Sequence, residues 1–319
     1  MPGKPSLLGV SFDGVVVYHS NARSIKLLAY ALAKDLNGIM MSEQTPVPCH
    51  NVVHMTTPTI STSLSIQTLR RSYSYVLYPF LEYIPHIDAN TVALIQTSKV
   101  FTSTNYIKYI LEEYLGAYAK VVKPRIPIVT RRIKRPRGVR PSFAPFACFI
   151  AANAPHKNIT DLLNIALKNK FNILVVSGPG FWYEYNKLCT LPNVKCITNA
   201  TSEELNWVYH NCGVYLALSH AEGLGMPPLE AAYRGIPVVA SDIPPYRETL
   251  SGYAEFVETK QIGEIDVPLW SKFPVTKIDV DYAIEVALDL MGKKKSPTAT
   301  VKEFFEHNEL ANELKKILK

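Results

Sequence analysis

The sequence has no long apolar run, no paired-cysteine motif and no recognisable secretory leader. No apolar segment reaches the roughly 18 residues that a membrane-spanning helix needs, and the first apolar segment is short and ends at Asp13. The five cysteines are scattered, odd in number and form no C-x-x-C pair, which disfavours a metal or redox site built from them. We therefore expect no secretory signal and buried free thiols in a reducing, intracellular setting. The protein would be cytoplasmic, either free or peripheral at a membrane.

Acidic residues are also missing from one long stretch, Tyr114 to Thr160, which carries ten Lys or Arg. The net charge of the whole chain is +7, so the remainder carries 7 − 10 = −3 and the basicity is local. Within this stretch, Lys123 to Pro141 has four prolines and no aromatic residue, a composition typical of an extended linker. It is either a solvated link or a surface that attracts phosphate, an anionic membrane or nucleic acid. The cations that would form this surface are Arg131, Arg132, Lys134, Arg135 and Arg137.

The chain does contain enough apolar sequence for two domains with full cores, at 319 residues and 47% hydrophobic content. Its most informative stretch is Ser219 to Asp242. Apolar runs at 213–218 and 238–240 predict two buried strands. Between them, Pro227-Pro228 suits the first turn of a helix and Gly235 suits its end. The order strand, loop, short helix, strand indicates a parallel α/β sheet.

The loop in this stretch carries groups that suit a nucleotide-sugar. Gly223 and Gly225 let a ligand approach the backbone closely. The helix that follows points its free N–H groups and its positive dipole end at the loop, which suits a diphosphate. Glu222 in the loop and Glu230, eight residues on, can both accept hydrogen bonds from sugar hydroxyls. The alternative is a glycine-rich turn with solvated glutamates, and local chemistry alone does not choose between the two.

Three segments of this stretch resemble the donor-site signature of retaining GT-B glycosyltransferases, above all family 4, also called glycosyltransferase group 1. They are Glu222-Gly-Leu-Gly, Pro228-Leu-Glu-Ala-Ala and Gly235-Ile-Pro-Val-Val-Ala-Ser-Asp. The resemblance implies that Glu222 contacts the transferred sugar and that Glu230 binds the ribose hydroxyls. The amides that would hold the sugar and the diphosphate belong to Gly223, Leu224 and Gly225. The family is usually metal-independent, so we expect no metal site and no cofactor beside the nucleoside-diphosphate sugar, which is the donor substrate.

A lysine contact to the donor diphosphate is implied by the segment Ala152-Asn-Ala-Pro-His-Lys157, which follows a predicted strand at 146–151. It resembles the family segment that carries this lysine, so Lys157 joins Glu222 as a predicted catalytic residue. The family usually has an arginine five residues earlier, where this chain has Ala152. Either phosphate binding is weaker without it, or Arg23 or an arginine of the linker substitutes for it. The alternative is a lysine that only caps a loop.

Two weaker donor contacts come from the first domain. We expect a first strand at residues 6–12, a turn at Asp13-Gly14 and a helix from Arg23 to Lys34. In the family, the loop after the first strand approaches the donor phosphates. Gly14 would occupy that loop, and Arg23 would reach a phosphate from the helix. The alternative for Arg23 is an exposed helix arginine.

Two residues are candidates for the acceptor side of the cleft. His54 lies near the end of a predicted strand at 52–55, a position that often lines the cleft in this family. Glu82 follows a predicted strand at 72–80, in a segment that resembles an aromatic-x-x-Glu pattern of some members. The alternatives are a structural histidine and an ordinary loop carboxylate.

The expected fold class is α/β of the GT-B type, with two doubly wound Rossmann-like domains facing each other across a cleft. An amphipathic helix at 301–318 would return to the first domain. The expected divisions are an acceptor-side domain at 1–124, a basic linker at 125–142, a nucleotide-sugar-binding domain at 143–298 and a C-terminal helix at 299–319.

These observations predict a retaining glycosyltransferase of the hexosyltransferase type. It would move a sugar from a nucleoside-diphosphate sugar to a sugar, lipid or other acceptor that the sequence does not identify. One alternative is a non-catalytic protein on a degenerate scaffold, which binds nucleic acid or a membrane through the basic linker. Another is a nucleotide-dependent oxidoreductase that uses Gly178-Pro-Gly180, although the full dinucleotide spacing is absent.

Overall fold

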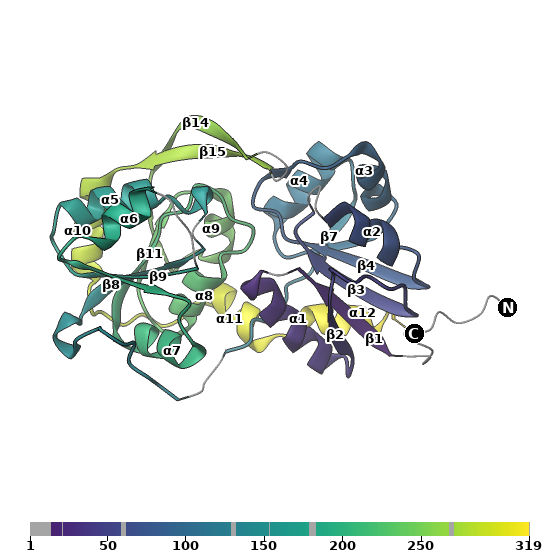
Figure 1. Ribbon diagram of the computed structural model, residues 1–319, viewed down its shortest axis with the longest axis horizontal. Coiled ribbons are helices and arrows are strands. Elements are labelled where there is room, and N and C mark those ends of the chain that lie inside the picture. The colour runs from purple at the N-terminus through teal and green to yellow at the C-terminus, as the bar shows by residue number, and fades with distance from the viewer. Residues whose placement is uncertain are drawn as a thin grey trace. The chain divides into compact units, whose positions relative to one another are not determined.

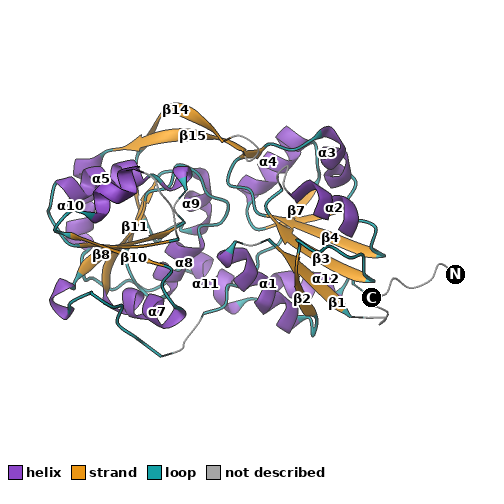
Figure 2. Ribbon diagram, in the orientation of Figure 1, coloured by secondary structure: helices purple, strands orange, loops and turns teal. Residues whose placement is uncertain are grey.

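The computed structural model describes residues 14–20, 22–58, 62–128, 132–152, 154–178, 183–267 and 271–318. The chain divides into two compact units, whose elements are drawn in Figure 1 and Figure 2. Unit 1 comprises Met1–Pro127, Ile265–Phe273 and Glu303–Lys319, and unit 2 comprises Ile128–Glu264 and Pro274–Lys302. The strand expected at residues 6–12 and the predicted cation Arg131 lie outside the described residues.

Unit 1 is built on a parallel sheet of six strands in the order β2-β1-β3-β4-β6-β7. The strands are β1 (Val15–His19), β2 (Ile39–Ser42), β3 (Asn51–Thr56), β4 (Ser74–Pro79), β6 (Lys99–Thr102) and β7 (Ala119–Val121). The helices between them are α1 (Arg23–Asp35), α2 (Ser63–Leu69), α3 (Ala89–Gln96) and α4 (Asn105–Leu115). In the sheet, β2 lies on one side of β1 and β3 on the other, so the chain crosses over β1 between β2 and β3. Right-handed crossovers then put α1 on one face and α2 and α3 on the other (Figure 1).

The residues of unit 1 explain this arrangement. All six residues of β3 are buried, because helices cover both faces of a parallel sheet and leave no strand face to water. In α1, Ile25, Leu28 and Leu32 are buried at helical spacing, as the sequence predicted. Thr104 accepts a hydrogen bond from the Ile107 amide and so caps α4.

Unit 2 repeats the architecture with the strand order β10-β9-β8-β11-β12-β13, again all parallel. The strands are β8 (Phe146–Ala151), β9 (Ile173–Ser177), β10 (Val194–Thr198), β11 (Cys212–Ala217), β12 (Val238–Ser241) and β13 (Glu255–Val257). The helices are α5 (Ile159–Leu167), α6 (Tyr183–Cys189), α7 (Ser202–Asn211), α8 (Met226–Tyr233), α9 (Pro244–Thr249) and α10 (Val280–Leu290). Figure 1 shows α5, α6 and α10 on one face and α7 and α8 on the other. The prediction of two Rossmann-like domains is confirmed.

The strand order of unit 2 reverses between β8 and β11, which are neighbours in the sheet. Because all the strands are parallel, the loops that follow β8 and β11 leave the sheet at the same edge. This topological switch point is where open α/β sheets bind ligands. The helix predicted after the β11 loop is confirmed as α8, with prolines in its first turn and Gly235 at a positive φ of 76° behind it.

One element has no counterpart in the sequence analysis. Strands β14 (Thr259–Val267) and β15 (Ser271–Ile278) form a three-stranded sheet with the short β5 (Ile84–Pro85). β15 runs antiparallel to β5, and Phe273 lies 4.8 Å from Tyr83 between ring centroids. β14 exposes most of its residues, so it has no apolar alternation from which a strand could be predicted.

Four of the five cysteines are paired, so the expectation of free thiols is wrong. Cys148 of β8 is bonded to Cys212 of β11, and Cys189 is bonded to Cys196. Cys49 is buried and free. The first pair is separated by 64 residues, and only the pairing of β8 with β11 brings its members together. The cysteine pattern therefore does not support the reducing setting that we expected.

The C-terminal segment forms two helices, α11 (Ala299–Glu306) and α12 (Glu309–Lys315), where the sequence analysis expected a single one. The break falls at Asn308, whose φ of −113° and ψ of 51° are not helical. The Leu310 amide donates to the Lys123 carbonyl at 3.2 Å, and the Lys123 amide donates to Glu309 Oε2 at 3.1 Å. These contacts bind α12 to the chain just after β7, the last strand of the unit 1 sheet. Among the described helices, none is long and apolar enough to cross a membrane.

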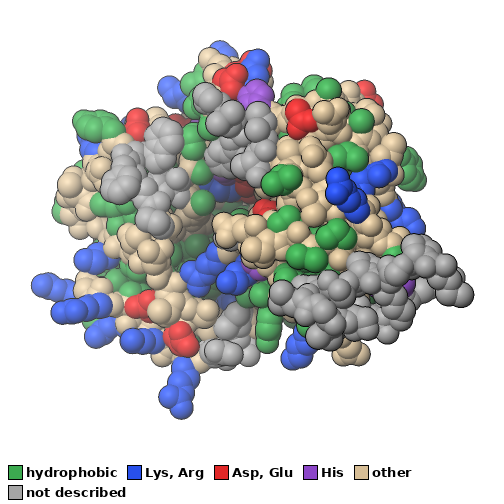
Figure 3. Space-filling model, turned by 45° about the vertical axis from the view of Figure 1, so that its right-hand side comes forward, with side chains coloured by type: hydrophobic (Ala, Val, Ile, Leu, Met, Phe, Trp, Pro, Cys, Tyr) green, Lys and Arg blue, Asp and Glu red, His purple; other side chains and the backbone are tan. Residues whose placement is uncertain are grey.

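The segment that joins β7 to β8 exposes five cations in its described part. They are Arg132, Lys134, Arg135, Arg137 and Arg140. The segment is fastened to α7 by a 3.1 Å hydrogen bond from the Lys134 amide to the Glu203 carbonyl, and Pro136 and Val139 are buried. Figure 3 shows Lys and Arg side chains gathered at the lower left of the view, the corner toward which this segment runs in Figure 1. We call the five exposed cations, Arg132, Lys134, Arg135, Arg137 and Arg140, the cationic segment.

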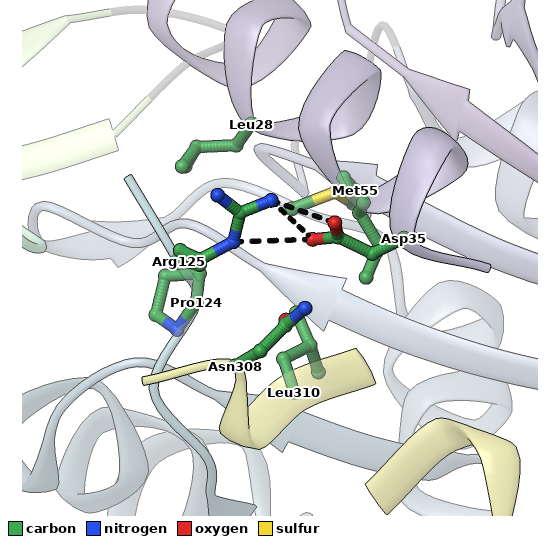
Figure 4. A pocket seen from close by; sticks show the side chains of 8 residues that line it. Leu28, Asp35, Met55, Pro124, Arg125, Asn308 and Leu310 are labelled. Atoms are coloured by element: carbon green, nitrogen blue, oxygen red, sulfur yellow. Dashed lines mark hydrogen bonds and ion pairs between the residues drawn. The ribbon is translucent and has the colours of Figure 1, made fainter. Parts of the chain in front are cut away.

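Arg125 behaves differently, although the sequence analysis placed it in the same linker. Its Nη2 lies 2.6 and 2.8 Å from the two carboxylate oxygens of Asp35 in α1. Figure 4 shows this pair among apolar side chains, with Leu28 on one side and Leu310 of α12 on the other. Arg125 is therefore a structural contact of unit 1 that joins the linker to α1.

We expect Arg125→Gln to lower the free energy of unfolding by about 1–2 kcal/mol, between the values typical of exposed and of buried ion pairs. The side chains of Arg125 and Asp35 are 32% and 15% exposed. The measurement is urea unfolding in a double-mutant cycle with Asp35→Asn. The exposed pair Lys293–Asp289 is the matched control, with side chains 58% and 71% exposed, and should give almost no coupling. A coupling at Arg125–Asp35 no larger than that of the control would contradict this role.

Candidate functional site

Two residues predicted to be catalytic meet at the switch point of unit 2. Lys157 comes from the 3₁₀ turn Pro155–Lys157 after β8, and Glu222 comes from the loop after β11. The Lys157 Nζ lies 2.6 Å from Glu222 Oε1. Lys157 is 9% exposed and Glu222 is 6% exposed, so both charges are largely removed from water. A buried charge is tolerated only when it is paired and hydrogen-bonded, so this pair requires its partners.

Two hydroxyl groups complete the surroundings of the Glu222 carboxylate. Ser219 Oγ donates to Glu222 Oε1 at 2.7 Å, and the Tyr246 hydroxyl donates to the same oxygen at 3.1 Å. Tyr246 also lies 3.3 Å from Ser219 Oγ. All three partners of Glu222 therefore contact Oε1. In the described part of the chain, no residue hydrogen bonds with Oε2.

The loops that carry Lys157 and Glu222 are tied together through their backbones. The His220 amide donates to the His156 carbonyl at 2.8 Å. Next to it, Asn158 adopts a left-handed conformation with φ 56° and caps α5 by accepting from the Asp161 amide at 3.1 Å. These bonds fix the turn that ends in Lys157 against the loop that contains Glu222.

β15 supports the same loop through a buried histidine. His220 Nδ1 accepts from the Thr276 amide at 3.1 Å and lies 3.0 Å from Thr276 Oγ1. The pKa of His220 is lowered from 6.5 to about 4, mainly by burial; Asp161 opposes this change and His156 adds a smaller part of it. Asp161 also accepts from the Ile278 amide of β15 at 3.2 Å. The neutral imidazole therefore fastens the Glu222 loop to β15.

Glu230 lies in α8 with its own partners. Arg234, one turn on, places Nη1 3.8 Å from Glu230 Oε2 and stacks over the Tyr209 ring at 4.5 Å. The Tyr209 hydroxyl donates to the Pro227 carbonyl at 3.3 Å, and burial together with the nearby Glu230 carboxylate raises the pKa of Tyr209 well above 10. The charges of Glu222 and Glu230 both reach Tyr215, whose pKa is raised mainly by burial. Both glutamates therefore lie near the buried Tyr215.

Gly225 joins the loop to α8 in a conformation that other residues rarely adopt, with φ 73°. A Cβ atom at this position would lie 2.7 Å from Cε1 of Tyr246. Glycine is therefore required both by the backbone and by the ring that packs against it. Gly223 and Leu224 are buried beside it.

The residues predicted from unit 1 are placed less favourably. Gly14 immediately precedes β1, and the strand expected before it, at residues 6–12, lies outside the described residues. It lies at the amino end of β1, away from the carboxyl edge where ligands bind. Arg23 is the first residue of α1 and is exposed.

The two predicted acceptor-side residues also lie in unit 1. His54 is fully buried in β3, with Nε2 2.8 Å from Glu43 Oε2 and Nδ1 2.9 Å from the Tyr75 hydroxyl. Both ring nitrogens are thus already used within the domain. Glu82 is half-buried in the loop after β4.

No group of three or more His, Cys, Asp or Glu that could hold a metal ion occurs among the described residues. The triplet Asp279-Val-Asp281 has a D-x-D spacing, but it begins α10. Asp279 caps this helix by accepting from the Tyr282 amide, and Asp281 Oδ1 lies 3.0 Å from Lys168 Nζ. Gly178 is the only residue of the predicted Gly178–Gly180 loop within the described ranges.

Sequence reasoning missed the residues that support the two glutamates: Ser219, His220, Tyr246, Thr276 and Tyr209. Ser219 and His220 adjoin the recognised loop, so their position was a usable signal. Tyr246, Thr276 and Tyr209 lie on α9, β15 and α7, and only the fold brings them to the site.

We expect the stability contributed by the neutral His220 to be lost in acid. Its folded pKa of about 4 lies below the unfolded value of 6.5, so protons bind preferentially to the unfolded chain. The contribution is complete above pH 6.5 and falls by roughly 3 kcal/mol as the pH drops through 4. Urea unfolding across this range should show the loss in the parent protein but not in His220→Gln. The exposed His307→Gln is the control and should follow the parent protein. Parallel curves for the parent and His220→Gln would contradict the assignment.

Comparison with known proteins places this site in a family. Residues 130–265 match the family model described as "Glycosyl transferases group 1". This range coincides closely with the long first segment of unit 2 and contains both Lys157 and Glu222. No curated protein sequence matches the chain.

Several solved structures share the fold. Sucrose-phosphate synthase from Thermosynechococcus elongatus superimposes with a TM-score of 0.65 at 12% identity, covering 95% of this chain and 97% of its own. WaaG, a glycosyltransferase involved in lipopolysaccharide biosynthesis, gives a TM-score of 0.58 at 12% identity, covering 95% and 99%. A chain of the GtfA/B complex gives 0.52 at 14% identity, covering 86% of this chain, which spans 58% of that longer protein. The likeness concerns the GT-B arrangement of two Rossmann-like units. Residues 130–265 of the chain therefore resemble the group 1 glycosyltransferases in sequence, and the chain shares the GT-B fold with these solved structures.

Proposed function

We propose that unit 2 binds a nucleoside-diphosphate sugar at the Lys157–Glu222 pair and that the protein transfers the sugar to an acceptor hydroxyl. The observation that carries this proposal is the buried 2.6 Å ion pair at the switch point, directly before the N-terminus of α8. A cation and a helix N-terminus suit a diphosphate, and the carboxylate suits sugar hydroxyls. The family of residues 130–265 supports the same reading.

Each charged group has a role in this proposal. Lys157 and the free amides of the first turn of α8 would stabilise the charge that develops on the leaving diphosphate. Glu222 would accept hydrogen bonds from the transferred sugar and orient its ring. Glu230, held by Arg234 and close to Tyr209, would accept hydrogen bonds from the ribose hydroxyls.

The proposed reaction retains the configuration of the anomeric carbon. The bond from this carbon to the β-phosphate oxygen breaks, and a bond to the acceptor oxygen forms on the same face. The acceptor proton passes to an oxygen of the leaving diphosphate, so no protein base is required. A retaining glycosidase uses two carboxylates about 5 Å apart, one as nucleophile and one as acid/base. The proposed reaction needs no such pair, and Glu222 is paired with Lys157 instead.

The acceptor is assigned to unit 1. Glu82 follows β4 at the carboxyl edge of the unit 1 sheet, which is where parallel sheets bind ligands. His54 would contribute by holding β3 and Glu43 in place, because both of its ring nitrogens are engaged inside the domain.

We expect a nucleotide-sugar to raise the unfolding temperature of the parent protein. Binding at 100 times the Kd adds about 2.7 kcal/mol to the free energy of unfolding. The measurement is a thermal-shift screen with UDP-, GDP-, ADP- and TDP-sugars. Glu230→Ala should abolish the shift, because a hydrogen bond to a charged group is worth roughly 1.5–3 kcal/mol. The Glu222→Gln variant should still bind the free nucleoside diphosphate, but it should no longer release nucleoside diphosphate from the nucleotide-sugar.

The matched control is Glu285→Ala, which removes an exposed glutamate of α10 in the same unit. It should behave as the parent protein in both assays. If no nucleotide-sugar shifts the folded parent protein, the proposal fails and the non-catalytic alternative gains support.

We also propose that the cationic segment attracts an anionic membrane surface, which would make the protein peripheral at that membrane. In the part of the chain that the structure describes, none of its five cations has an ion-pair partner. Ile133 lies among them and is 55% exposed, so it can enter the interface while the charges contact lipid headgroups. The segment has no aromatic residue on which bases could stack, which disfavours single-stranded nucleic acid.

We expect the protein to sediment with phosphatidylserine-containing vesicles and not with pure phosphatidylcholine. Each Lys or Arg near such a surface is worth about 1 kcal/mol, so replacing all five cations by Gln should remove most of the binding. The matched control replaces five exposed lysines elsewhere in unit 2: Lys170, Lys187, Lys260, Lys277 and Lys294. Equal losses in the two variants would show a general charge effect. If the protein bound duplex DNA in a salt-sensitive way and did not bind vesicles, the proposed partner of the cationic segment would be nucleic acid and not a membrane.

A further inference from the structure

We infer that Tyr246 is a positioning residue for the donor sugar. Together with Ser219, it holds one oxygen of the Glu222 carboxylate so that the other oxygen faces the ligand. This inference rests on the proposed function of the Lys157–Glu222 pair and adds to it a residue outside the loops that carry the pair.

The first support is the asymmetry of the carboxylate. The Lys157 ammonium and the Ser219 and Tyr246 hydroxyls all contact Oε1, at 2.6, 2.7 and 3.1 Å. No described residue hydrogen bonds with Oε2, which stays available as an acceptor. A carboxylate anchored on one oxygen has a fixed plane, so a hydroxyl that binds Oε2 is also fixed in direction.

The second support is the way in which Tyr246 itself is held. It comes from α9, which follows β12, the strand paired with β11. The side chain is 1% exposed, and its ring fills the space that a side chain at Gly225 would need. Burial and the nearby charge of Glu222 raise the pKa of Tyr246 well above 10, so the hydroxyl stays a donor at neutral pH.

The third support comes from what the donor would demand of Lys157. When the ammonium engages the diphosphate, Glu222 has to share or lose its only positive partner within the described residues. A carboxylate that is 6% exposed cannot recover this loss from water. The neutral donors Ser219 and Tyr246 keep Oε1 hydrogen-bonded at that stage without repelling the cation. The two hydroxyls thus allow Lys157 to serve the phosphate.

The test removes only the hydroxyl, with Tyr246→Phe, and keeps the ring against Gly225. The matched control is Tyr253→Phe. Tyr253 is also fully buried in unit 2, but its hydroxyl donates to the Ile236 carbonyl at 2.9 Å and does not contact Glu222. Both variants are first checked for cooperative thermal unfolding. They are then assayed with whichever of UDP-glucose, GDP-mannose, ADP-glucose and TDP-glucose stabilises the parent protein.

For Tyr246→Phe we expect release of the nucleoside diphosphate to fall about tenfold or more in kcat, the size of a lost hydrogen bond to a charged group. The affinity for the free nucleoside diphosphate should stay unchanged, because that ligand has no sugar to position. Tyr253→Phe should match the parent protein in both measurements. Equal kcat values in Tyr246→Phe and the parent would overturn the inference and leave the proposed function intact. A parallel loss of diphosphate affinity would also overturn it, because it would indicate a general structural effect.

A second measurement decides the inference even if none of these nucleotide-sugars binds. It is a double-mutant cycle between Tyr246→Phe and Glu222→Leu in urea unfolding without ligand. A hydroxyl that holds the carboxylate should show a coupling of about tenfold in the unfolding equilibrium constant. The cycle of Tyr253→Phe with Glu222→Leu should show none. An absent Tyr246–Glu222 coupling would refute the positioning contact, whereas a parent protein that binds no donor would refute only the proposed function.

Discussion

Two opposite charges with almost no access to water constrain the whole of unit 2. Lys157 and Glu222 are only 9% and 6% exposed and interact at 2.6 Å. Desolvation of such a pair costs free energy that its mutual attraction recovers only when the remaining hydrogen-bonding groups are satisfied. The partners of Glu222 and the backbone bond from His220 to His156 are therefore conditions for the pair to exist. Because burying this pair costs free energy of folding, its presence is better explained by a chemical role than by a contribution to stability.

The strand order, which no local segment of the sequence indicates, brings these residues together. β8 and β11 are neighbours in the sheet, although β9 and β10 lie between them in the chain. Reversal of the strand order at this point makes the loop after β8 and the loop after β11 adjacent. α9 follows from the next strand, β12, and delivers Tyr246 to the same edge. β15 closes the other side through Thr276. Three segments distant in sequence, the turn after β8, α9 and β15, thus contact the Glu222 carboxylate or the loop that carries it.

The sequence was most informative where function requires unusual residue types next to each other. The β11–α8–β12 unit and Glu222 beside it could be predicted from three features: glycines at 223 and 225, paired prolines, and two glutamates eight residues apart. Lys157 followed from its segment. Tyr246 could not be predicted, because a buried tyrosine on a short helix is indistinguishable from a core residue until its hydroxyl is located. The pairing of Cys148 with Cys212 depends on strand order, and the exposed β14 has no apolar period.

The resting arrangement of the pair also bears on how a donor would enter. An incoming diphosphate meets Lys157 already engaged by Glu222, and the carboxylate repels it. Binding therefore has to redirect the ammonium while the carboxylate stays in place. Moving Glu222 instead would leave Ser219 and Tyr246, which are both buried, without their acceptor. The lower-cost path keeps Glu222 fixed and turns the flexible lysine, whose four-carbon stem permits it. On this argument the sugar-binding group is preorganised before the donor arrives, and the phosphate-binding group is the one that adapts.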